Sequence, residues 1–157
     1  MTLKELEEFA KPIKFREDME RSVEFGRKTA TRRLLKNQDS NAYCAAPCED
    51  EEGSVDLICE GADGVTYALY NKAKYKVGDI LYIKEQCRKE AEKIFLLVTG
   101  VRVQRVEEIT EDEAIDEGFA SRAEFLVAFF EIYPKADMRS WVWAIEFQRL
   151  EVDVDDI

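Results

Sequence analysis

The residues best suited to chemistry lie in one segment, 26–36, which reads GRKTATRRLLK and holds five cations and no acid. Two threonines, Thr29 and Thr31, stand among these cations. A threonine hydroxyl becomes a competent nucleophile only when a nearby base takes its proton. The chain has no histidine, so Lys28 is the natural base, provided that burial or the flanking cations lower its pKa. The segment therefore predicts either nucleophilic chemistry at Thr31 or a loop that binds an anion.

Negative charge gathers in a second segment, 107–117, which holds seven acids and no base. The seven are Glu107, Glu108, Glu111, Asp112, Glu113, Asp116 and Glu117. A carboxylate from this set could orient the lysine or move a proton to a leaving nitrogen, but spacing alone does not select one of them. The alternative is that both segments are solvated faces, joined only by surface ion pairs worth under about 1 kcal/mol each.

The overall charge restricts the classes of ligand. Twenty-three basic and 34 acidic side chains give a net charge of −11, which argues against a protein that coats duplex nucleic acid, because neutralising phosphates needs a surplus of cations. A local basic pocket for one nucleotide remains compatible with this charge. The absence of histidine also excludes the usual Ser-His and Cys-His catalytic pairs.

The four cysteines, Cys44, Cys48, Cys59 and Cys87, are the only candidates for a soft metal site. Cys44 and Cys48 have a spacing that zinc ligands use, but the other two are far apart and no histidine accompanies them. We therefore predict free thiols and expect neither a metal nor a cofactor, with a four-cysteine zinc site as the alternative. No run of about 18 apolar residues could span a bilayer, and the N-terminus lacks the order of a signal peptide, so we expect a cytoplasmic protein without membrane contacts.

Capping boxes and apolar spacing predict four helices, and alternation of apolar residues predicts the strands. The expected helices are 2–10, 16–25, 111–117 and 121–132; the expected strands are 29–35, 55–59, 65–69, 80–84, 94–106 and 141–148. Two of these strands flank Asp63-Gly64 as a hairpin. This mixture suits one α+β domain over residues 1–157, built on a small closed or nearly closed sheet. We interpret 37–74 as an insertion that decorates the domain and 151–157 as a frayed acidic tail. The aromatic residues of the last strand are predicted to be core.

Four sequence blocks in order resemble one known family. The segment 26–33, GRKTATRR, resembles the Gly-Arg-Lys-Thr-x-Thr-x-Arg signature of the ASCH family, whose members are PUA-like domains. The others are YKVGDILY at 75–82, ITEDEA at 109–114 with the pair at 117–118, and WVWAIEF at 141–147. The resemblance covers about 12–36 and 75–150 and is closest to ASCH proteins of phages and prophages. It implies a small PUA-like (ASCH) β-barrel with flanking helices.

The resemblance also implies an activity and site residues. The family was proposed to bind RNA, and a compact bacterial branch is an amidohydrolase that removes acetate from N4-acetylcytidine. Carried over by motif, the nucleophile is Thr31, the activating base is Lys28 and the third residue is Glu117. Arg27, Thr29, Arg32 and Arg33 are then candidates for binding the ligand. The insertion at 37–74 and the doubled arginine depart from the pattern and affect the expected substrate most.

The expected partner is a modified nucleoside, a nucleotide or RNA, bound at the loop 26–33 and hydrolysed there if the three site residues act together. One alternative is a binding module that breaks no bond. Another is a phage-related interaction protein whose basic loop meets an acidic partner. The charge of −11 favours a small ligand over a long strand.

Overall fold

The computed structural model describes residues 2–83 and 94–151, and these form four helices and eight strands. The helices are α1 (Leu3–Phe9), α2 (Glu17–Glu24), α3 (Glu111–Asp116) and α4 (Arg122–Ile132). The strands are β1 (Lys11–Ile13), β2 (Ala30–Leu34), β3 (Ala42–Pro47), β4 (Ser54–Glu60), β5 (Thr66–Lys72), β6 (Ile80–Ile83), β7 (Phe95–Arg105) and β8 (Trp141–Leu150). The predicted α+β class is confirmed. Cys87 and most of the expected tail at 151–157 lie outside the described residues.

The main sheet has five strands in the order β1-β6-β7-β8-β2, with β1 parallel to β6 and the other pairs antiparallel. The prediction of a small β-barrel on a closed or nearly closed sheet is wrong: among the described residues, β1 and β2 are the two edges of an open sheet. A physical reason lies in β1, which has only three residues with Pro12 at its centre. Proline has no N–H to donate, so this strand makes a poor edge for further pairing.

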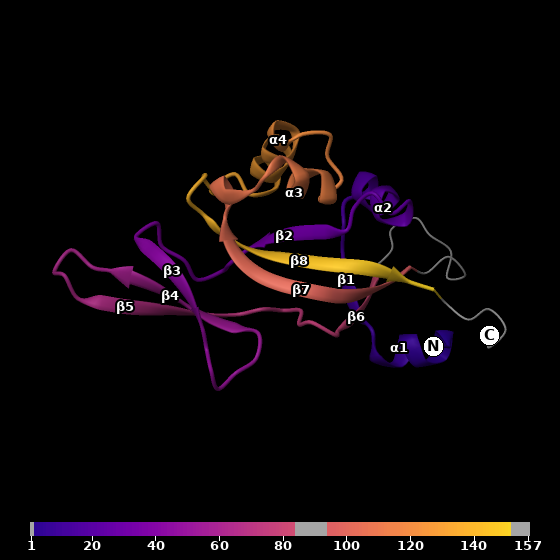
Figure 1. Cartoon of the computed structure of the whole chain (residues 1–157), viewed down its shortest axis with the longest axis horizontal. Helices are drawn as coiled ribbons and strands as arrows, with labels where there is room; N and C mark the ends of the chain where they lie inside the picture. The colour runs from indigo at the N-terminus through magenta and orange to yellow at the C-terminus, as the bar shows by residue number, and fades with distance from the viewer. Residues whose placement is uncertain (1, 84–93, 152–157) are drawn as a thin grey trace.

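A second sheet, β3-β4-β5, is formed within the segment 37–74. Strands β4 and β5 pair in antiparallel register from Ser54 with Lys72 to Glu60 with Thr66, around the turn that contains Asp63 and Gly64. Figure 1 shows this sheet projecting to one side of the five-stranded sheet. Its inner residue Leu57 is fully buried in the same hydrophobic core as the main sheet. The two sheets therefore share a core where they meet.

The helix boundaries follow local capping bonds. The hydroxyls of Thr2, Thr110 and Ser121 accept hydrogen bonds from the backbone N–H three residues later, at 3.1, 3.1 and 3.2 Å. Figure 1 shows α2, α3 and α4 along the part of the main sheet that ends in β2, with α1 near β6 on the other side. Within the described residues, no helix has the length and apolar character that crossing a membrane requires. Residues of α2, β2 and α4 line one cleft.

Candidate functional site

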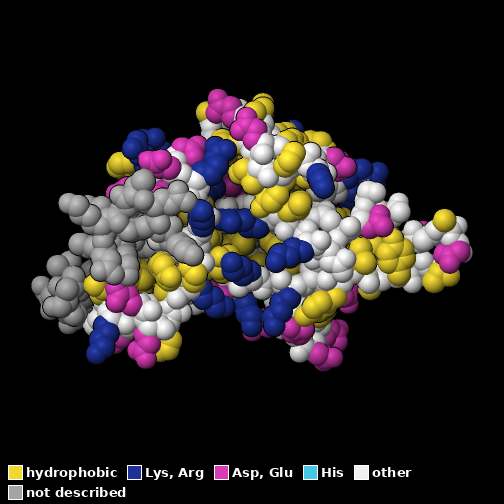
Figure 2. All heavy atoms as spheres, turned by 180° about the vertical axis from the view of Figure 1, so that it is seen from behind, with side chains coloured by type: hydrophobic (Ala, Val, Ile, Leu, Met, Phe, Trp, Pro, Cys, Tyr) yellow, Lys and Arg dark blue, Asp and Glu magenta, His cyan; other side chains and the backbone are white. Residues whose placement is uncertain are grey.

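A cleft of about 470 Å³ occupies the space between α2, β2 and the α3–α4 pair. Its cations come from the residues before α2 and from the segment 28–33, and its aromatic rings come mainly from α4 and its flanks. Figure 2 shows Lys and Arg side chains gathered around a hollow with apolar side chains in its floor. The charged and polar lining residues are Lys14, Arg16, Lys28, Thr31, Arg32, Arg33 and Glu117; the rings are Phe15, Phe119, Phe125, Phe129 and Tyr133.

The turn after α2 places Lys28 at the cleft. Gly26 has φ 75°, a conformation that favours glycine, and it reverses the chain so that the N–H groups of Arg27 and Lys28 both donate to the carbonyl of Ser22, at 2.8 and 3.0 Å. The N–H of Thr29 then donates to the carbonyl of Asp116 at 2.7 Å. This last bond ties the start of β2 to α3, which brings the basic segment against part of the acidic one.

Glu117 enters the site because α3 ends there. It is the C-cap residue, and Gly118 follows with φ 96°. A Cβ at position 118 would lie 3.3 Å from the Cβ of Ser22 and 3.4 Å from that of Lys28, so only glycine fits both the conformation and the close approach without a shift of neighbours. The tight contact between α3 and the end of α2 therefore fixes the position of Glu117.

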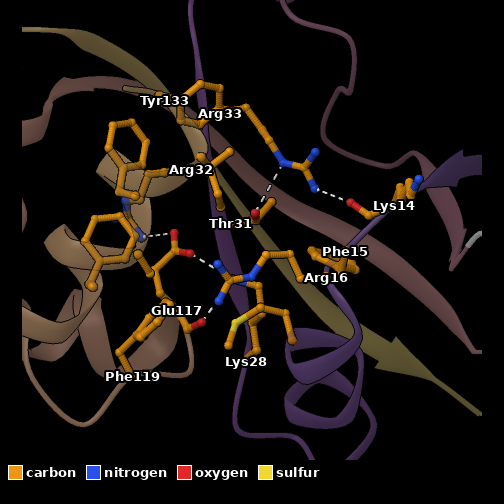
Figure 3. A pocket seen from close by; sticks show the side chains of 15 residues that line it. Lys14, Phe15, Arg16, Lys28, Thr31, Arg32, Arg33, Glu117, Phe119 and Tyr133 are labelled. Carbon is orange, nitrogen blue, oxygen red and sulfur yellow. Dashed lines mark hydrogen bonds and ion pairs between the residues drawn. The ribbon is translucent and has the colours of Figure 1, made fainter. Parts of the chain in front are cut away.

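The carboxylate of Glu117 joins two buried cations. The Nζ atom of Lys28 donates to Oε2 at 2.8 Å and to the backbone carbonyl of Glu117 at 2.9 Å, and Nη1 of Arg32 donates to Oε1 at 3.0 Å. All three side chains are at most 4% exposed. In Figure 3 the carboxylate points toward both cations. This is a buried charge network rather than a pair of solvated faces.

Arg32 is committed to protein partners. Its Nε donates to Gln104 at 2.8 Å and its Nη2 to Glu113 at 2.6 Å, in addition to the bond with Glu117. Glu113 also binds Arg102. Burial alone would raise the pKa of Glu113. The hydrogen bonds from Arg102 and from the N–H of Thr110, together with the charge of Arg32, outweigh burial and hold this pKa below its usual range. The guanidinium of Arg32 thus positions the two glutamates.

The burial of Lys28 changes its acid–base behaviour. Desolvation lowers the pKa of Lys28, the charge and hydrogen bond of Glu117 oppose this, and the nearby charges of Arg33 and Arg32 lower the pKa further. The net direction is downward. The amine is therefore easier to deprotonate than an exposed lysine, as a general base requires.

Thr31 lies in the cleft, 5% exposed, beside this network. Nε of Arg33 lies 3.4 Å from its Oγ1, and Nη2 of Arg33 donates to the carbonyl of Lys14 at 2.9 Å. These two residues share a face of β2 because they are two positions apart. In the described part of the chain, the Nζ of Lys28 makes its hydrogen bonds with Glu117 and makes none with Thr31. The hydroxyl is held by the arginine instead.

Five of the seven residues predicted for the site line the cleft, and two do not. Lys28, Thr31, Arg32, Arg33 and Glu117 come together. Arg27 and Thr29 are exposed and lie outside it. The guanidinium of Arg27 stands instead 5.9 Å from the ring centre of Phe25.

Other lining residues were missed by the sequence analysis. Lys14, Phe15 and Arg16 precede α2, and none of them was a candidate for the site. Phe119 and Tyr133 flank α4. The aromatic stripe of β8 is core, since Trp143 and Phe147 are buried in the main hydrophobic cluster.

Three of the four cysteines lie within the residues that the structure describes. Cys44 is exposed, Cys48 half-buried and Cys59 buried, and all three are free thiols. Burial is the first cause that raises the pKa of Cys59 and of Cys48. Within residues 2–83 and 94–151, no group of three or more metal-ligating side chains is found.

Comparison with known proteins supports one fold. No protein-family model and no curated protein sequence matches the chain. Among solved structures, it is similar to the crystal structure of an ASCH domain from Lactobacillus crispatus JV V101, with a TM-score of 0.55 and 14% sequence identity, over 95% of this chain and 86% of that chain. The chain has the ASCH fold. The ASCH fold predicted from the four sequence blocks is thus confirmed, apart from the closure of its sheet into a barrel. In this fold Lys28, Thr31, Arg32 and Arg33 line one cleft together with Glu117.

Proposed function

We propose that the cleft binds the nucleoside unit of a modified nucleoside, a nucleotide or RNA, and hydrolyses an acyl-amide on its base. The observation that carries this proposal is the buried network of Lys28, Glu117 and Arg32 beside Thr31, in a cleft walled by aromatic rings. Buried charges of this kind are costly to maintain, and perturbed ionisable groups in a cleft are typical of functional sites.

The walls of the cleft suit a nucleoside. Its volume of about 470 Å³ is within the range of small-molecule sites. Phe119 and Tyr133 offer rings on which a base can stack, and both are partly exposed in the cleft. Lys14 and Arg16 stand at the same cleft with exposed side chains, and they would hold a phosphate of the ligand.

Polar residues of the site have separate roles in the proposed hydrolysis. Neutral Lys28 takes the proton of Thr31, whose Oγ attacks the acyl carbon and forms a tetrahedral intermediate; Arg33, already 3.4 Å from Oγ, stabilises the oxyanion. The C–N bond breaks and the proton on Lys28 passes to the leaving nitrogen. Water then hydrolyses the acyl-threonine ester, with Lys28 taking and returning the proton. Glu117 orients the lysine throughout.

A second candidate is binding without hydrolysis. One observation favours it: the Nζ of Lys28 is bonded to Glu117 and makes no hydrogen bond with Thr31 in the part of the chain that the structure describes. Catalysis requires the lysine to move toward Thr31 when substrate binds, as catalytic hydrogen bonds often tighten only in the complex. Measuring binding and turnover separately distinguishes the two functions.

Binding is tested by calorimetric titration with cytidine 5′-monophosphate, cytidine and N4-acetylcytidine. We expect saturable binding that Tyr133→Leu weakens by about 5- to 150-fold, because stacking of a base on an aromatic ring is worth about 1–3 kcal/mol. The matched control is Tyr43→Leu, since Tyr43 is exposed on β3 and outside the cleft. Equal affinities of the two variants would contradict binding of the base in this cleft.

Turnover should increase with pH. Only the neutral form of Lys28 accepts a proton, and the pKa of Lys28 is lowered, so kcat/KM rises along a limb centred below the ordinary lysine value. Arg33 contributes to lowering this pKa; Arg33→Met should therefore move the limb to higher pH. A pH profile of the two proteins checks this. A limb that stays in place, or moves to lower pH, would exclude Lys28 as the group being titrated.

A further inference from the structure

A second concavity continues from the cleft. It encloses about 720 Å³ and is lined by the end of β2, the end of β5 and the residues after each strand. Arg33 and Tyr133 line both it and the cleft, so the two spaces meet at these residues. We call this concavity the basic groove, because its charged lining residues are four cations, Arg33, Lys36, Lys72 and Lys74, and no acid among the described residues.

Two hydrogen bonds between Asn37 and Asn71 join the two walls of the basic groove. The N–H of Asn37 donates to the side chain of Asn71 at 3.0 Å, and the amide of Asn71 donates back to the carbonyl of Asn37 at 2.7 Å. Asn71 is 5% exposed. Because Asn37 follows Lys36 and Asn71 precedes Lys72, these bonds bring cations from two separate segments of the sequence into one groove.

Several of these cations lack a compensating carboxylate. Lys72 pairs with Glu51 at 3.1 Å, and in the cleft Arg16 pairs with Asp18 at 2.9 Å. By contrast, within residues 2–83 and 94–151, Lys36 and Lys74 in the groove form no ion pair, and neither do Lys14 and Arg33 in the cleft. Lys74 lies 5.6 Å from the ring centre of the buried Tyr75. Among the described residues, these four cations have no paired carboxylate although the chain has a net charge of −11. Such a local excess of positive charge indicates a polyanionic ligand.

We propose that a single-stranded nucleic acid lies along the basic groove, with one nucleotide in the cleft and the phosphodiesters beside it over Lys36 and Lys74. This inference rests on the proposed function for the nucleotide in the cleft. A base reaches a ring-lined cleft only when it is unpaired. The net charge of −11 also disfavours binding of a duplex, which needs a surplus of cations. The ligand is thus longer than one nucleoside, and the sheet β3-β4-β5 supplies part of its binding surface.

The test measures fluorescence anisotropy of a labelled single strand of about ten nucleotides, a common site size, as RNA and as DNA of the same sequence. Lys36→Gln/Lys74→Gln should reduce the slope of log affinity against log salt by about 1.4, since each phosphate contact contributes about 0.7 for single strands. At 0.1 M salt this corresponds to a loss of about 25-fold. The control is Lys4→Gln/Arg21→Gln, which removes the same charge from exposed positions outside the cleft and groove.

The outcomes separate this inference from the proposed function. We expect cytidine 5′-monophosphate to bind the Lys36/Lys74 double variant as well as it binds the parent, while the strand binds more weakly; a preference for RNA or DNA then identifies the sugar. If the mononucleotide binds but the two double variants bind the strand equally, the groove proposal is wrong and the cleft proposal stands. If the strand depends on Lys36 and Lys74 while no mononucleotide binds, the groove stands without the cleft. Oligoglutamate that competes as strongly as the strand would also overturn the proposal.

Discussion

Replacing Glu117 with glutamine is expected to lower the free energy of unfolding by about 3–5 kcal/mol, the usual cost of removing one partner from a buried ion pair. The carboxylate of Glu117 is the only acid bonded to Lys28 among the described residues, and it also binds Arg32. A neutral amide leaves the ammonium of Lys28 buried at 4% exposure with no opposite charge beside it. Chemical denaturation of the two proteins at neutral pH, followed by circular dichroism, gives the difference.

The matched control is Glu113→Gln. Glu113 pairs with Arg32 as well, but its side chain is 20% exposed and its other partner, Arg102, is 46% exposed. Arg32 retains Glu117 and Gln104 in this variant, so a smaller loss is expected. The double variant Lys28→Met/Glu117→Gln should recover part of the stability lost by Glu117→Gln, because it also removes the unpaired ammonium. Equal losses for Glu117→Gln and Glu113→Gln would show that burial of the Lys28–Glu117 pair does not control stability.

The helices could be predicted from sequence because their signals are local. Thr2, Thr110 and Ser121 each bind a backbone N–H only three residues away, and such bonds leave a pattern that can be seen in the sequence. Strand β1 was missed because its three residues form a strand only by parallel pairing with β6, about 70 residues later. The open sheet was missed for a related reason: closure depends on which edges meet, and no local pattern encodes that.

The site was predicted in part. The sequence located the basic segment and seven acids, but Lys28 and Glu117 are 89 positions apart, and only the family resemblance singled out that acid. Arg32 was predicted to bind ligand, whereas its guanidinium is occupied by Gln104, Glu113 and Glu117. An arginine in a basic run has the same appearance in the sequence whether its partner is a ligand or a distant buried side chain. Tertiary contacts decide between them.

The largest effect on chemistry is expected at Thr31. Thr31→Val replaces the hydroxyl with a methyl group of similar size, and we expect it to reduce kcat for N4-acetylcytidine hydrolysis by about 1,000-fold or more, as loss of a nucleophile does. Because Arg33 is the hydrogen-bond partner of this hydroxyl among the described residues, binding of cytidine should change little. The measurement is release of cytidine followed by chromatography.

Thr29→Val is the matched control, because it makes the same chemical change two residues away at an exposed position outside the cleft. If Thr31 is the nucleophile, Thr29→Val retains full turnover while Thr31→Val loses it. Turnover that survives in Thr31→Val would exclude the acyl-threonine route. The described lining of the cleft holds one other hydroxyl, that of Tyr133. Cytidine binding without turnover in the parent protein would instead assign the buried lysine and glutamate to holding the cleft in shape, and the ASCH fold here would be a binding module.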